Sequence, residues 1–282
     1  MPLPSSGPLS LNQIGVELQV SSPYSLNNMS LQARQNAEPH SVSELYSYSP
    51  PSWPANRIVY LNAADPASYP GSGTTWTDTI SGYNVTLTNP VFTQKGGYFT
   101  SNSSTNFVMP GNSTIYSSDF TWCMRVKFLS TGTDWFGLWW SESGVKNFLM
   151  GVYVSTTSYF APRIDTQSTS YQYWNSNSGT GNGGNSPAQS NANLLQTTPW
   201  SLLSVVKNGT TFTWYLNGDS TPLWQITINN WSIGSTTQNI NLMCKSQGSF
   251  FAPAQVNKVV MFNRALSTGE IANVHLLTNM AG

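Results

Sequence analysis

The ionisable side chains of this sequence are few and poorly spaced for catalysis. Glycoside hydrolysis needs two carboxyl groups at a fixed separation, but Glu142 is the only glutamate between residues 45 and 269, and Asp134 precedes it on an expected loop. His40 and His275 have no neighbour at the spacing of a metal site and no visible Ser or Cys partner. We therefore expect solvated loop acids, no resident cofactor and a protein that is not an enzyme.

The composition indicates a weakly charged, polar surface with many aromatic residues. Charged residues make up 8% of the 282, the formal net charge is zero, and 13% are aromatic, whereas soluble domains average about 25% charged residues. Zero net charge gives no support to nucleic-acid binding. No apolar run approaches the roughly 18 residues that span a bilayer, so no membrane insertion is expected. Such surfaces are common in extracellular binding modules and virus particles.

The strongest local signal is the hairpin predicted within Trp200–Gly218. Two runs of β-type residues flank Asn208-Gly209, a pair that tolerates positive φ. A two-residue turn there predicts Val205 opposite Phe212 on an apolar face, with a mostly hydroxylated face turned to solvent.

Short strands separated by turn residues are expected along most of the remaining chain. Their ranges are Arg57–Leu61, Tyr83–Leu87, Gly97–Thr100, Asn106–Met109, Phe120–Leu129, Trp135–Trp140, Asn147–Ser155, Tyr159–Ile164, Leu223–Ile228, Ser235–Leu242 and Gln255–Asn263. This pattern predicts an all-β, antiparallel sandwich or jelly roll. A capping box at Ser267–Glu270 predicts a short helix that lays Ile271, Val274 and Leu277 on the sandwich. Strand phase places Cys123 and Cys244 on different kinds of face, so we expect two reduced thiols.

Residues 1–52 differ from residues 53–282, and the Pro-rich stretch 50–54 marks the boundary between them. Capping boxes at Ser10–Gln13 and Ser41–Glu44 predict short helices in a mostly helical segment. So small a segment cannot bury enough apolar surface to fold unaided, so it must dock on the main domain or on another protein. The alternative is a flexible N-terminus. The residues expected to make that assembly contact are Leu9, Ile14, Leu18, Met29, Leu31, Leu45 and Tyr46.

Four stretches of residues 57–278 resemble concanavalin A-like lectin/glucanase (laminin G-like) domains of tailed-phage proteins. They are Leu61–Asp78, the strand Phe120–Val126, the Y-x-N-G hairpin Tyr215–Gly218 and the closing N-R-A-L-S-x-x-E-I segment Asn263–Ile271. The resemblance implies a two-sheet antiparallel jelly roll, a concanavalin A-like sandwich. Glycosidases also occur on that fold, but their close-set Glu-x-Asp-x-x-Glu strand is missing here.

The N-terminal stretches Pro4–Ile14 and Ser41–Tyr46 resemble the attachment segment of many phage virion proteins. This resemblance implies a structural protein of a tailed-phage particle (decoration, fibre or tail module), in which residues 1–52 contact other virion proteins and the jelly roll serves adhesion or assembly. Such a protein is located in the virion, assembled in host cytoplasm, and is expected to be a homo-oligomer. The alternatives are a lectin that binds a host surface glycan and, less favoured, a glycan hydrolase.

Two sets of ligand-binding residues follow. Several laminin G-like domains bind calcium at a loop edge, and Asp65 and Asp78 flank a turn suited to that role, although both can simply cap turns. Sugar binding needs aromatic faces, for which the candidates are Trp135, Trp139, Trp140, Tyr171, Tyr173 and Trp174. If Trp139 and Trp140 lie in a strand, they face opposite sides, so one belongs to the core. The alternative is that most of these rings pack between the sheets.

Overall fold

A computed structural model gives the fold. It describes residues 10, 14, 51–101, 105–115, 119–129, 134–141, 148–154, 160–165, 172–174, 200–228, 238–243 and 254–280; within 134–174 only Leu138 and Trp139 have described side chains. The chain divides into two compact units, Met1–Ser52 and Trp53–Gly282.

Strands of the second unit form two antiparallel sheets, each of eight strands in the described residues. Sheet A has the order β14-β13-β12-β7-β16-β5-β4, with β1 also paired to β16. Its strands are β1 (Arg57–Asn62), β4 (Val91–Thr93), β5 (Tyr98–Thr100), β7 (Phe120–Phe128), β12 (Ser201–Asn208), β13 (Thr211–Leu216), β14 (Trp224–Thr227) and β16 (Ala254–Phe262). Sheet B has the order β11-β10-β9-β8-β15-β6-β3-β2. Its strands are β2 (Thr75–Trp76), β3 (Val85–Thr88), β6 (Asn106–Met109), β8 (Asp134–Ser141), β9 (Phe148–Val154), β10 (Phe160–Asp165), β11 (Gln172–Trp174) and β15 (Ile240–Leu242).

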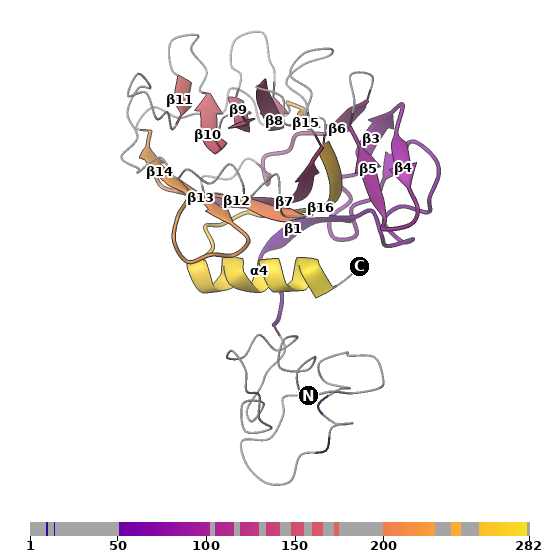
Figure 1. The fold of residues 1–282 in the computed structure, drawn as a ribbon, viewed down its shortest axis with the longest axis horizontal. Coiled ribbons are helices and arrows are strands. Elements are labelled where there is room, and N and C mark those ends of the chain that lie inside the picture. The colour runs from indigo at the N-terminus through magenta and orange to yellow at the C-terminus, as the bar shows by residue number, and fades with distance from the viewer. Residues whose placement is uncertain are drawn as a thin grey trace. The chain divides into compact units, whose positions relative to one another are not determined.

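The two sheets stack face to face, and helix α4 (Thr268–Met280) lies on the outer side of sheet A (Figure 1). This arrangement confirms the predicted all-β sandwich of two antiparallel sheets. Most strand predictions agree with the structure, but β2, β4 and β11 are additional, and β15 is shorter than the range expected for it.

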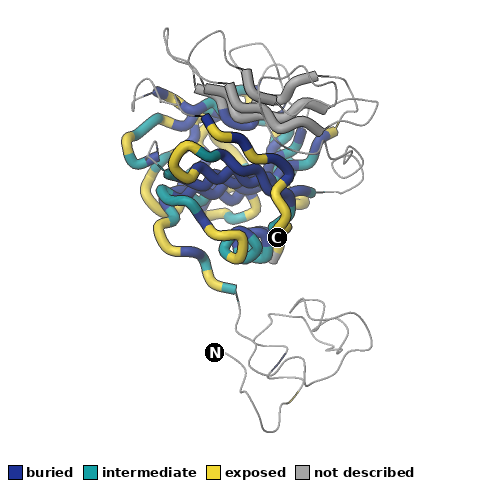
Figure 2. The backbone as a smooth tube through the Cα atoms, turned by 90° about the vertical axis from the view of Figure 1, so that its left-hand side faces the viewer, coloured by how far each residue is buried: buried dark blue, intermediate teal, exposed yellow. Residues whose placement is uncertain are grey.

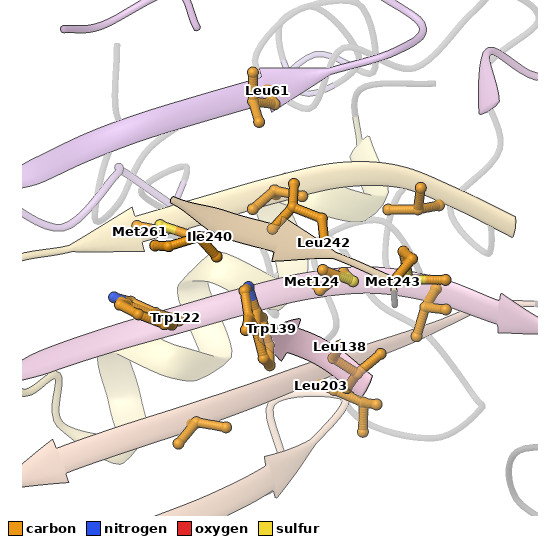
Figure 3. Close-up of a cluster of buried hydrophobic side chains, with 14 of the residues drawn as sticks. Leu61, Trp122, Met124, Leu138, Trp139, Leu203, Ile240, Leu242, Met243 and Met261 are labelled. Carbon is orange, nitrogen blue, oxygen red and sulfur yellow. The ribbon is translucent and has the colours of Figure 1, made fainter. Parts of the chain in front are cut away.

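The main core lies between the sheets and is built largely from tryptophan and phenylalanine. Trp122 of β7 and Trp139 of β8 are fully buried, and their ring centroids are 6.3 Å apart. They face each other from opposite sheets (Figure 3). Strands β7, β12 and β16 are buried along most of their length, and Figure 2 shows the buried residues gathered in the middle of the described part of this unit. Large aromatic side chains bury much apolar area per residue, which lets a chain with so few charges form one extensive core.

The predicted hairpin exists, but its register is two residues from the expected one. Val205 pairs with Trp214, and Asn208 pairs with Thr211, so the turn residues are Gly209 and Thr210. Gly209 has a φ of 57°, as the first central residue of a type II′ turn requires. A shift of two residues keeps every side chain on its predicted face.

Over the hairpin strands β12 and β13, the outer face of sheet A is covered rather than solvated, which corrects the expectation of a wet face there. Leu202, Val206 and Tyr215 form a second buried cluster with Ile271 and Val274 of α4. Cys123 belongs to this cluster and is a free thiol, as predicted; Cys244 lies outside the described residues. The sequence predicted that α4 packs on the sandwich but not that it covers this face.

The predicted capping box begins α4. The N–H of Ser267 donates to Glu270 Oε2 at 2.9 Å, and the carboxylate of Glu270 also accepts a forked pair of hydrogen bonds from the guanidinium of Arg264. Arg264 Nε in turn donates to the carbonyl of Ala55 at 3.2 Å. The N-R-A-L-S-x-x-E-I segment therefore fastens the helix start to the turn that precedes β1.

The Y-x-N-G hairpin has an equally structural role. Asn217 and Gly218 have φ values of 53° and 72°, and Asn217 Oδ1 accepts from the N–H of Leu202 at 2.8 Å. A Cβ on Gly218 would lie 2.8 Å from the Cβ of His275 and 3.0 Å from the Cα of Ala272. Only glycine fits between this turn and α4.

The first unit is described at two positions only. The N–H of Ile14 donates to the carbonyl of Ser10 at 3.1 Å, and Ile14 is helical and fully buried. The other residues expected to make the assembly contact, Leu9, Leu18, Met29, Leu31, Leu45 and Tyr46, lie outside the described residues.

Candidate functional site

The carboxylate of Asp78 accepts hydrogen bonds from four backbone N–H groups. Oδ1 accepts from the N–H groups of Tyr60 at 2.8 Å and Ile80 at 3.1 Å, and Oδ2 accepts from Ser81 at 2.9 Å and Tyr83 at 3.1 Å. Only 4% of Asp78 is exposed. The side chain holds the loop after β2 against β1, as a carboxylate that accepts several N–H groups does.

Asp65 also caps a turn. Its Oδ1 accepts from the N–H of Ala67 at 2.9 Å, and its backbone carbonyl accepts from Ser68 and Tyr69. Turn capping is the alternative that the sequence left open for both carboxylates. Among the side chains described, no group of three His, Cys, Asp or Glu is placed to hold a metal ion. The calcium site therefore stays a prediction without structural support.

Of the aromatic candidates for glycan binding, Trp139 belongs to the core. It is fully buried and lies 6.3 Å and 6.4 Å, between ring centroids, from Trp122 and Trp214. A sugar ring cannot stack on a tryptophan enclosed by other rings. The sequence analysis required one of the adjacent residues Trp139 and Trp140 to belong to the core, and Trp139 is that residue.

The other aromatic candidates occupy two strands of sheet B. Trp135 and Trp140 lie in β8, opposite Tyr153 and Leu149 of β9. Tyr173 and Trp174 lie in β11, opposite Ile164 and Arg163 of β10. Since β9 and β10 separate these strands, the two pairs are about 14 Å apart across the sheet at the usual strand spacing. Tyr171 lies outside the described residues.

The catalytic candidates do not meet in the part of the chain that is described. Asp134 was expected on a loop, but its backbone begins β8, opposite Val154, whereas Glu142 and His40 lie outside the described residues. His275 is buried in α4, where Nε2 lies 3.0 Å from Nδ2 of Asn279. The described ranges also contain no helix with the length and apolar content needed to cross a membrane.

One group of residues was not singled out from the sequence. Arg125 and Lys127 lie on the outer face of sheet A, and the guanidinium carbon of Arg125 lies 5.2 Å from the ring centroid of Trp200. The ring of Trp200 contacts that of Tyr98, with centroids 5.7 Å apart. Cys123, Arg125 and Lys127 alternate along β7, which puts the two cations on one face, but the aromatic residues come from distant strands and gave no local signal.

Comparison with known proteins shows the fold and leaves the family open. No family model matches the sequence, and no curated protein matches it. A Trypanosoma rangeli sialidase in complex with sialic acid aligns with a TM-score of 0.58 at 13% identity, over 88% of this chain and 36% of that one. The binding domain of botulinum neurotoxin DC in complex with SialylT aligns with a TM-score of 0.53 at 13% identity, over 80% of this chain and 52% of that one.

These matches change two predictions. The chain spans about a third of the sialidase and half of the toxin chain, and similarity at this identity establishes the β-sandwich alone. The solved structures support the sandwich, whereas membership of a phage or concanavalin A-like family is not shown. The prediction that the protein is not an enzyme is contradicted, because sialidases are enzymes and stand among the structures that share this fold.

Proposed function

We propose that residues 53–282 form a glycan-binding module. The observation that carries the proposal is the shared sandwich: one neighbour is a toxin binding domain in complex with SialylT and another is a sialidase in complex with sialic acid. The composition agrees, because an uncharged surface rich in hydroxyl, amide and aromatic groups suits sugar hydroxyls and C–H faces.

The spacing of the aromatic positions supports one kind of glycan over another. Trp135 and Trp140 in β8 are about 14 Å of sheet away from Tyr173 and Trp174 in β11. A single sugar ring does not cover that distance. The module therefore suits an extended oligosaccharide or a polysaccharide whose chain crosses strands β8 to β11.

A glycan array probed with the intact chain tests this proposal. Saturable binding to an oligosaccharide, weakened by Trp140→Ala and by Trp174→Ala, is the expected result, because each loses one stacking surface. Trp53→Ala removes a partly buried tryptophan of the α4 side and serves as the matched control. The same samples, assayed for released sugar with Glu142→Gln alongside, show whether binding leads to hydrolysis. A chain that binds no glycan would overturn the proposal.

A second role is supported by the N-terminal unit. Met1–Ser52 is a compact unit of its own, and its sequence resembles virion attachment segments. We propose that it joins the module to other proteins of a tailed-phage particle, where the chain acts as a decoration, fibre or tail component and a homo-oligomer. Residues 53–282 alone should stay folded and fail to join particles; unchanged incorporation would contradict this role.

A further inference from the structure

Arg125 lies in an unusual electrostatic environment on sheet A. It is half-buried, and burial lowers its pKa. Its register partner on β16 is Lys258, so two cations lie directly opposite each other; like charges in that position are destabilising. Lys127 follows two residues later on the same face of β7. Arg125 and Lys127 form no ion pair with any residue that the structure describes.

Three other described cations lie beside a carboxylate. Lys207 lies 3.7 Å from Asp119, and Arg264 is paired with Glu270. Arg57 is also half-buried and lies over two rings, Trp53 at 4.2 Å and Tyr60 at 4.9 Å, but the nearby charge of Asp78 offsets its own. The face around Arg125 therefore carries an excess of positive charge in a chain whose net charge is zero.

One aromatic ring, that of Trp200, contacts Arg125, and the ring of Tyr98 contacts that of Trp200. Trp200 continues β12 and Tyr98 begins β5, so the rings come from opposite sides of β7 and β16 and contact each other above the sheet. Both rings are partly exposed, as are Arg125 and Lys127. A guanidinium fork binds a carboxylate through two parallel hydrogen bonds, and a partly exposed tryptophan offers a face to the C–H groups of a sugar ring.

We propose that Arg125, Lys127, Tyr98 and Trp200 form a site for a carboxylate-bearing sugar, a sialic or uronic acid unit of a glycan. The inference rests on the proposed glycan-binding function and adds to it the charge of the ligand and a location on sheet A, away from β8 and β11. Arg125 binds the carboxylate, Lys127 adds long-range attraction, and Trp200 carries the ring. A bound anion also relieves the repulsion between Arg125 and Lys258.

Titration of the intact chain with N-acetylneuraminic acid and with glucuronic acid, each beside its methyl ester, tests the site. Both free acids should bind, and the one that binds more strongly shows whether the site prefers a sialic acid or a uronic acid. Each ester should bind at least about tenfold more weakly than its acid, because a hydrogen bond to a charged group is lost. Arg125→Met should cause a similar loss, whereas Arg57→Met, the matched half-buried arginine, should not. Thermal unfolding shows whether each variant is folded. If Arg125→Met is unstable, Arg125→Lys replaces it in the test, because it keeps the positive charge but cannot form the two parallel hydrogen bonds of a guanidinium.

The outcomes separate this inference from the proposed function. Equal binding of acid and ester, or binding that Arg125→Met and Arg125→Lys both leave unchanged, overturns the carboxylate site while glycan binding stands. Binding of neutral oligosaccharides only has the same meaning. A chain that binds neither charged nor neutral glycans overturns both proposals.

Discussion

Lys258 Nζ donates a hydrogen bond to the backbone carbonyl of Thr278, and the lysine is fully buried between sheet A and the end of α4. The last carbonyls of a helix have no partner within the helix and carry partial negative charge. The ammonium group supplies both a donor and a positive charge. One side chain of β16 thereby attaches the C-terminal end of α4 to the sheet.

This contact predicts a pH dependence of stability. Burial, and then the neighbouring Arg125, lower the pKa of Lys258 to about 8, against about 10.4 in an unfolded chain. At pH values between these two pKa values, Lys258 is protonated in the unfolded chain and neutral in the folded one. The contribution of Lys258 to the free energy of unfolding therefore rises with pH. The difference in free energy of unfolding between the wild type and Lys258→Met, measured by urea titration from pH 7 to 10, should therefore change with pH.

Lys95 provides the control because it is exposed. Lys95→Met should keep the pH dependence of the wild type. Burial raises the pKa values of Cys123, Tyr60 and Tyr215, but these groups are common to all three proteins and their contributions cancel in the comparison. A constant difference between Lys258→Met and the wild type over this pH range would show that Lys258 has an ordinary pKa.

The ion pair between Arg264 and Glu270 predicts that the stability of the start of α4 falls at acid pH. Hydrogen bonds from Arg264, and then from Ser267, lower the pKa of Glu270 to about 2. The stabilisation is complete above the unfolded pKa near 4.3 and is lost as the pH falls toward 2. Glu270→Gln should lower stability at pH 7 by about 1 kcal/mol, as loss of a helix cap does, and should remove this part of the acid dependence. Asp219→Asn, which changes an exposed turn carboxylate, should leave it in place.

Alanine substitutions at Gly218 and Gly209 allow the cost of backbone strain to be distinguished from the cost of a steric clash. Both have positive φ, but a Cβ at Gly209 meets nothing within 4 Å, whereas one at Gly218 meets His275 and Ala272. Gly209→Ala should cost only the conformational penalty of about 1 to 2 kcal/mol. Gly218→Ala should cost clearly more, because α4 must also move. Equal losses in chemical denaturation would mean that α4 does not pack tightly on the turn.

The thiol of Cys123 should be unreactive in the folded protein. It is fully buried, and burial raises its pKa to about 12; only the thiolate is a good nucleophile. Iodoacetamide followed by peptide mapping should label Cys123 in urea and leave it unlabelled in buffer. Labelling of Cys123 in buffer, at the rate found in urea, would contradict the burial beneath α4.

The alternation of apolar and polar residues was sufficient to predict most strands and the faces of their side chains. The features that it did not predict depend on contacts between residues far apart in the sequence. The Asn208-Gly209 signal located the hairpin, but Asp119 Oδ1 accepts the N–H of Gly209 at 2.7 Å, and Lys207 Nζ donates to its carbonyl at 2.7 Å. These contacts hold Gly209 as the first turn residue. No local pattern contains Asp119, which lies ninety residues earlier.

The same limit applies to the candidate site. The sequence required either Trp139 or Trp140 in the core, but only the pairing of β8 with β9 and β15 identifies Trp139 as that residue. The exclusion of an enzyme relied on a missing acid pair, whereas sialidases, which are enzymes, stand among the structures that share this fold. The group of Arg125, Trp200 and Tyr98 forms only after β7, β12 and β5 join one sheet.

Glycan binding by the sandwich is the central claim, and calorimetric titration of the intact chain with the strongest array ligand tests it most directly. The account predicts a saturable heat of binding that Trp140→Ala and Trp174→Ala each reduce and that Trp53→Ala leaves unchanged. Absence of any saturable heat with the wild type, at concentrations where the protein stays folded, would contradict it.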